Sequence, residues 1–148
     1  MQTDTINHWS ILDVDGVSWA SRAGVGLVLL SLTGEPIEQS VCLDFSTSNN
    51  EAEYEAIIVS LELALTLATS KIETRSDSQL VVGQIQREYE VRDERMVRYL
   101  SGMESRLAKL SNWRVKRVPR EENEKVNALA EVTATLPITE SIMLPVYV

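Results

Sequence analysis

Hydrophobic positions along the first half of the chain recur with the period of strands and then with the period of a helix. Segments rich in Val, Ile and Leu, separated by Gly, Ser and Pro, predict three consecutive antiparallel strands. Ser48 and Glu51 form a capping-box pattern ahead of apolar residues at helical spacing, which predicts a long helix from about 49 to 69. The strands are expected at 9–14, 24–30 and 37–45, with a turn through Gly16 and residues 18–22.

The second half of the chain alternates shorter strands and helices. Helices between strands imply parallel crossovers, so the later strands should join the sheet in parallel. We therefore expect an α/β fold: a five-stranded mixed sheet, with three antiparallel strands followed by two parallel ones, and helices on both faces. The expected elements are strands at 71–75 and 113–118 and helices at 79–87, 92–110 and 123–133.

Length and composition favour one domain. The chain has 148 residues, of which 44% are hydrophobic and 24% charged, enough for a single core. We expect the domain at 1–134 and an extended tail or interdomain linker at 135–148, where Pro137 and Pro145 disfavour helix. A single cysteine, Cys42, cannot form an internal disulfide.

The chain has neither a signal-peptide pattern nor the roughly 18 to 20 apolar residues of a membrane span, so a monomeric intracellular protein of the cytoplasm or nucleus is expected, not a secreted one.

The charge of the chain is uneven. A net charge of −8 disfavours binding to nucleic acid, which usually requires Lys and Arg. Residues 92–120, however, carry nine basic side chains against three acidic ones. Such a segment is either a contact surface for a polyanion or a solvated helix face with local ion pairs, and the sequence leaves both interpretations open.

Three acidic residues stand in separate settings: Asp15 before Gly16, Glu53 early in the long helix, and Asp77 before Ser78. Taken alone, each has an ordinary structural explanation as a turn residue, a residue that complements the helix dipole, or a cap. Carboxylates placed at strand ends and helix starts can also converge to bind divalent cations, and two such cations can cleave a phosphodiester.

In order and context these segments resemble type I ribonuclease H, most closely the reverse transcriptase-associated form of plant gypsy-class retrotransposon polyproteins. The resemblance extends from residue 9 to about 134. It implies the ribonuclease H fold and hydrolysis of the RNA strand of RNA–DNA hybrids by two Mg²⁺ ions, with Mn²⁺ as a substitute. An adjacent reverse transcriptase domain would be a further partner. The motifs that carry it are Asp15-Gly16, Asn49-Asn50-Glu51-Ala52-Glu53, Ser76-Asp77-Ser78-Gln79 and Ala128-Leu129-Ala130.

The resemblance assigns the metal ligands and catalytic residues to Asp15, Glu53, Asp77 and position 127. Asp15 would lie between both ions, Glu53 and Asp77 on the side of the leaving group, and residue 127 beside the ion that positions the attacking water. Here position 127 is Asn, whose amide keeps an oxygen but loses the negative charge, so weaker metal binding and reduced activity are expected.

Three explanations of Asn127 remain open: a degenerate copy of a mobile element, an engineered Asp-to-Asn change, or an active variant that uses Glu124 or Glu131 instead. The alternative function is a catalytically impaired domain that binds hybrid or supports a retroelement polyprotein. A third hypothesis is a module that binds only protein.

The resemblance assigns nucleic-acid contacts to Gly16, Ser48, Asn49, Asn50 and Gln79. Amide side chains near the metals suit the 2′-hydroxyls by which RNA differs from DNA. Ser48 is also explained as a helix N-cap, and the two roles are compatible. Trp19 could stack on a sugar or base, or simply be a partly buried turn residue.

Overall fold

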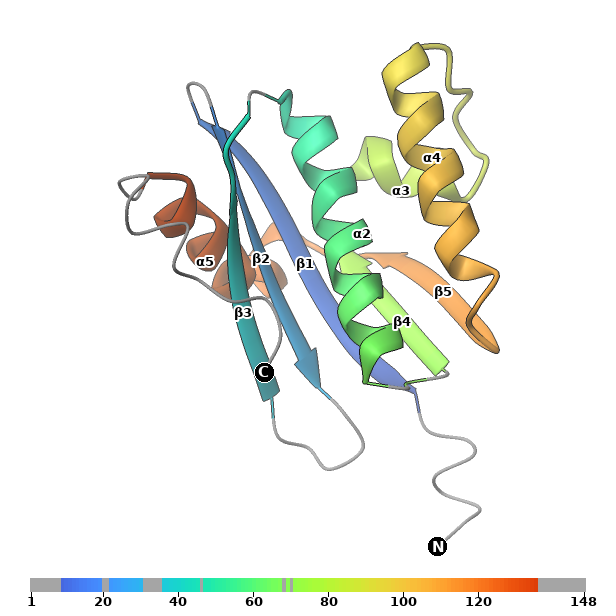
Figure 1. Ribbon diagram of the computed structural model, residues 1–148, viewed down its shortest axis with the longest axis horizontal. Coiled ribbons are helices and arrows are strands. Elements are labelled where there is room, and N and C mark those ends of the chain that lie inside the picture. Colours follow the sequence, from blue (N-terminus) through green and yellow to red (C-terminus); the bar gives the residue numbers. More distant parts are fainter. Residues whose placement is uncertain are drawn as a thin grey trace, which may run out of the picture.

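The computed structural model describes residues 9–19, 22–30, 36–45, 47–67, 69 and 71–135. Their centre is a five-stranded sheet in the order β3-β2-β1-β4-β5 (Figure 1). β2 pairs antiparallel with both β1 and β3, whereas β4 pairs in parallel with β1 and with β5. The strands are β1 (Ser10–Trp19), β2 (Arg22–Leu30), β3 (Pro36–Leu43), β4 (Lys71–Ser76) and β5 (Asn112–Arg117).

Helices cover both faces of this sheet. α2 packs along β1 and β2 on one face, and α4 packs on α2 (Figure 1). α5 lies across β2 and β1 on the opposite face, so the sheet is sandwiched where these helices overlap. The helices are α2 (Asn49–Thr66), α3 (Gln79–Ile85), α4 (Glu94–Leu107), the 3₁₀ turn η1 (Arg120–Asn123) and α5 (Glu124–Thr135).

The main core lies between the sheet and α2. Leu12, Leu27 and Ile57 are fully buried there. Tyr54, also fully buried, stacks on Tyr99 of α4 with ring centroids 5.8 Å apart. Its hydroxyl donates a 2.6 Å hydrogen bond to Oε1 of Gln84 on α3, so one residue joins three helices.

Two glycines allow helices to lie directly on the sheet. A Cβ atom at Gly16 would come within 2.1 Å of the carbonyl oxygen of Ala52 on α2. A Cβ at Gly24 would come within 2.0 Å of the carbonyl oxygen of Ala130 on α5. Only glycine fits such approaches, and α2 and α5 are thereby held close to β1 and β2.

The predicted order of elements, the mixed sheet and the two covered faces are all confirmed. The prediction that the first strand ends at 14, before a turn through Gly16, is wrong. β1 continues to Trp19, since Gly16 to Ser18 pair in register with Val25 to Ala23. The helices predicted at 49–69 and 92–110 each end about three residues earlier, at Thr66 and Leu107.

The predicted boundary at 135 adjoins the end of α5 at Thr135, and residues 136–148 of the predicted tail lie outside the described residues. Among the residues that are described, no helix is both long and apolar enough to cross a membrane.

Candidate active site

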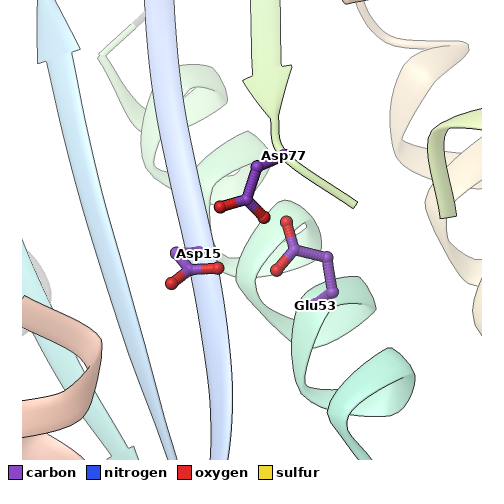
Figure 2. A group of neighbouring side chains, drawn as sticks. All are labelled: Asp15, Glu53 and Asp77. Carbon is purple, nitrogen blue, oxygen red and sulfur yellow. The ribbon is translucent and has the colours of Figure 1, made fainter. Parts of the chain in front are cut away.

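Three carboxylates from three different elements meet at one end of the sheet. Asp15 lies on β1, Glu53 on the first half of α2, and Asp77 directly after β4. One carboxylate oxygen of each lies within 4.8 Å of the others, and Figure 2 shows the three side chains directed toward one another. Asp15 and Glu53 are only 4% and 3% exposed. The structure therefore brings together all three acids that the sequence singled out.

Glu53 is held by hydrogen bonds from both neighbouring strands. Its Oε1 accepts a 2.9 Å bond from the backbone nitrogen of Gly16, and its Oε2 accepts a 2.5 Å bond from Oγ of Ser76. Ser76 Oγ in turn accepts a 3.1 Å bond from the backbone nitrogen of Ser78. β1, α2 and the end of β4 are thus bonded through one carboxylate.

Burial makes this cluster costly in its charged form. Burial chiefly raises the pKa of Glu53 well above its usual value, and the nearby Asp15 carboxylate raises it further. Burial also raises the pKa of Asp15, but less, because the hydrogen bond from Asn127 counteracts it. For Glu53, the hydrogen bonds from Ser76 and Gly16 counteract part of the rise in pKa.

The donor set fits a hard divalent cation. All three side chains offer carboxylate oxygens, the ligands that Mg²⁺ prefers. Oδ2 of Asp77 is buried and has no hydrogen-bond partner among the described residues, which is unfavourable unless a cation or water contacts it. Positive charge at this point would also relieve the repulsion between buried carboxylates.

Asn127 lies in the same site, on α5. Its Nδ2 donates a 2.7 Å hydrogen bond to Oδ2 of Asp15. α5 is positioned by the turn before it, where the buried Asn123 donates from Nδ2 to the carbonyl oxygen of Val14, 3.0 Å away. The residue at 127 therefore contacts the acid cluster directly through Asp15.

A cavity of about 800 Å³ opens over the acids. Of the residues that the resemblance assigns to nucleic-acid contacts, Gly16, Asn49 and Asn50 line it. Ser48 and Gln79 are not among the lining residues. Ser48 instead caps α2 by accepting from the backbone nitrogen of Glu51, and Gln79 Nε2 donates to the Tyr89 hydroxyl 3.0 Å away.

Asn49 is partly committed to the fold. Its Oδ1 accepts from both the backbone nitrogen and Oγ of Ser18, at 3.1 and 2.7 Å. Only the amide nitrogen remains to contact a ligand, so Asn49 can act as a donor and not as an acceptor. Of the two glutamates considered as substitutes for a fourth acid, Glu131 lines the cavity and Glu124 does not.

Three residues of the site were missed from the sequence: Ser76, Asn123 and Arg120. Ser76 and Asn123 act through contacts with residues far away in the chain. Ser76 belongs to the motif around Asp77, but nothing in that motif indicates its bond to Glu53. Arg120 is the one of the nine basic residues of 92–120 that lines the acidic cavity. Several of the others make ion pairs, including Arg95 with Glu51 and Arg106 with Glu62, as the solvated-face interpretation expects.

Comparison with known proteins agrees with this geometry. The model of the family described as reverse transcriptase-like matches residues 13–133. The chain belongs to that family. This RNase H-like domain is 35% identical, over 108 residues, to ribonuclease HI of Halobacterium salinarum, a match that covers 73% of the chain. It spans about half of that relative, 54% of its length.

Solved structures of RNase H1 proteins resemble the domain in fold. The crystal structure of RNase H1 from the halophilic archaeon Halobacterium salinarum is 33% identical with a TM-score of 0.78, covering 84% of this chain and 96% of that one. LC11-RNase H1, solved in complex with an RNA/DNA hybrid, is 29% identical with a TM-score of 0.74, covering 83% and 94%. The protease-reverse transcriptase of prototype foamy virus shares the fold at 14% identity and a TM-score of 0.68, covering 90% of this chain and 22% of that one.

Proposed function

We propose that this RNase H-like domain hydrolyses the RNA strand of RNA–DNA hybrids, using divalent cations bound by Asp15, Glu53 and Asp77. The observation that carries the proposal is the convergence of these carboxylates, from three separate elements, within 4.8 Å of one another. Two Mg²⁺ ions, or Mn²⁺ as a substitute, would supply activation of water and stabilisation of the leaving oxygen.

The protein's own groups prepare this chemistry. Asp15 lies on the central strand, β1, between Asn127, which donates a hydrogen bond to it, and the carboxylates of Glu53 and Asp77. This position suits a carboxylate that would lie between two ions. Glu53 is kept in one orientation by hydrogen bonds from Gly16 and Ser76. Asp77 offers the unpaired oxygen Oδ2.

Asn127 weakens this activity in the proposed mechanism. A neutral amide beside Asp15 supplies less attraction for a dication than a carboxylate would. Because the amide already donates to Asp15, it also favours the metal-free arrangement of the site. This second observation supports the alternative function, a hybrid-binding or structural domain with impaired catalysis.

The substrate and the wider context are also proposals. A relative, LC11-RNase H1, was solved with an RNA/DNA hybrid, which supports the same substrate here. The amide nitrogens of Asn49 and Asn50 would donate to ribose 2′-oxygens near the cleavage site. The family match and the foamy virus neighbour support a reverse transcriptase as partner, and the motifs favour a plant gypsy-class polyprotein. We further propose a monomer that acts inside the cell.

Cleavage assays test the function directly. Labelled RNA–DNA hybrid is incubated with the unchanged protein, Asn127→Asp and Asp15→Asn, each with Mg²⁺ or Mn²⁺. We expect weak cleavage by the unchanged protein, faster cleavage by Asn127→Asp, and none by Asp15→Asn. Asp13→Asn is the matched control, because Asp13 lies on the same strand but does not line the cavity.

Each outcome separates the candidate functions. Cleavage by Asn127→Asp alone would support the impaired-domain alternative. If neither the unchanged protein nor Asn127→Asp cleaves or binds hybrid, both the nuclease proposal and the hybrid-binding alternative fail. Undiminished activity in Asp15→Asn would refute the assigned role of Asp15.

A further inference from the structure

Trp19 is an exposed aromatic residue at the acidic cavity. It is 54% exposed and lines the same cavity as the three carboxylates. The other two tryptophans are engaged within the fold: the Arg114 guanidinium lies 4.0 Å from the ring centroid of Trp9, and Nε1 of Trp113 donates to Oγ1 of Thr74. A large apolar ring left facing an open polar cavity suggests that a ligand covers it.

The backbone below this ring is firmly held. Trp19 is the last residue of β1 and pairs with Arg22 at the start of β2. The preceding residue, Ser18, donates two hydrogen bonds to Asn49 at the start of α2. The indole is therefore presented by a strand end tied to a neighbouring strand and to a helix.

Arg120 also lines this cavity and lies at the start of η1, which follows β5. It is exposed and makes no salt bridge within the described part of the chain. Its turn is fixed by the backbone bond from Val118 to Ser76 and by the bond from Asn123 to Val14. The cavity thus combines an aromatic face, a group of carboxylates and an arginine that makes no salt bridge among the described residues.

We propose that Trp19 is a stacking platform for a nucleotide of the strand that enters the carboxylate cavity, and that Arg120 contacts a phosphate of the same strand. Aromatic faces together with cations are how proteins hold nucleic-acid strands without reading their sequence. An apolar segment of a protein partner fits less well, because carboxylates and amides surround the ring. The inference rests on the proposed function and names the residues that hold its substrate.

Binding of a short RNA–DNA hybrid in Mg²⁺ tests the proposal. Every protein carries Asp77→Asn, so that the hybrid stays intact during the measurement. Trp19→Ala should raise Kd by about 5- to 150-fold, which corresponds to ~1–3 kcal/mol for one base–aromatic stack, whereas Trp19→Phe should stay within about threefold. Arg120→Gln should raise Kd and make binding less sensitive to salt.

Two further measurements separate stacking from a structural role. Leu67→Ala is the matched control, because Leu67 is similarly exposed at 47% but lies at the opposite end of α2, and its Kd should be unchanged. Tryptophan emission should be quenched when hybrid binds, and Trp19→Phe should lose this quenching while still binding. If Trp19 acted only through overall packing, its replacement by Phe would not abolish the quenching while leaving hybrid binding intact.

The inference is overturned if Trp19→Ala binds as tightly as its parent, if Trp19→Phe binds as weakly as Trp19→Ala, or if quenching persists in Trp19→Phe. In each of these cases the parent still binds hybrid, so the proposed function survives. If the protein with Trp19, with or without Asp77→Asn, shows no affinity for hybrid at any Mg²⁺ concentration, both proposals fail.

Discussion

Replacing Asn127 by Asp should make the folded state dependent on metal. The substitution removes the 2.7 Å hydrogen bond to Asp15, and a hydrogen bond to a charged group contributes about 1.5–3 kcal/mol. It also places a fourth carboxylate against Asp15, and two unit charges ~4 Å apart repel by about 4 kcal/mol at an effective dielectric constant of ~20. Protonation and side-chain rotation relieve part of this repulsion, so we expect the free energy of unfolding without metal to fall by about 2–4 kcal/mol.

That loss can be measured by thermal unfolding. At about 2–4 °C per kcal/mol for a domain of this size, Asn127→Asp should lower Tm by about 5–15 °C in EDTA. A cation stabilises the folded state by about 2.7 kcal/mol when its concentration is about 100 times Kd. We expect the variant, with a fourth carboxylate, to bind cations more tightly, so Mg²⁺ should raise its Tm more than that of the unchanged protein.

The matched control is Asn112→Asp, which makes the same charge change on an exposed residue at the start of β5. Its Tm should be nearly unchanged and should not respond further to Mg²⁺. Our account of the site would be refuted if Asn127→Asp were as stable as its parent in EDTA. It would also be refuted if Mg²⁺ raised both melting temperatures equally.

Two further predictions concern the scaffold. Burial alone would raise the pKa of Glu73, but hydrogen bonds from Arg75 and Arg114 lower it below 4.5. The ionised side chain of Glu73 therefore stabilises the folded state above pH 4.5, and this stabilisation is lost as the pH falls through the lowered pKa. Glu73→Gln should lower Tm at pH 7 by the equivalent of about 1–3 kcal/mol, with the difference shrinking in acid; an equal difference at every pH would contradict this. Gly24→Ala should push α5 away from β2 and lower the free energy of unfolding by about 1–3 kcal/mol, measured in denaturant. Gly102→Ala is the control and should not destabilise, because the nearest atom to its Cβ, on Arg106, would be 3.7 Å away. Similar effects of both substitutions would contradict the packing argument.

The sequence predicts the acid cluster through the joint order and context of its motifs, which resemble those of type I ribonuclease H, since each acid taken alone has an ordinary structural explanation. Asp15 lies on a strand, Glu53 follows a capping box, and Asp77 lies between a strand and a helix cap. Once the order of elements implies a mixed sheet, these positions fall at one end of it. The strand pattern itself misled at Gly16, because a glycine that admits α2 at close range looks locally like a turn residue.

The residues that support the cluster could not be predicted in this way. Ser76 bonds to Glu53 across 23 positions, and Asn123 bonds to Val14 across 109. Neither type of residue is unusual beside a helix start, where short polar side chains normally cap. Arg120 could not be singled out for a different reason: it ends a segment with eight other basic residues, and only the fold shows that it alone of the nine lines the cavity.

The placement of Asn127 also bears on how a weakened site differs from one that only binds. Its side chain contacts Asp15 directly, so the amide occupies the place that a carboxylate of similar shape would take, without the negative charge. Loss of charge lowers the affinity for cations, and a higher cation concentration offsets lower affinity by mass action. A weakened enzyme should therefore recover turnover as Mn²⁺ or Mg²⁺ rises. A domain that only binds hybrid would gain affinity for its ligand under the same conditions and still release no product.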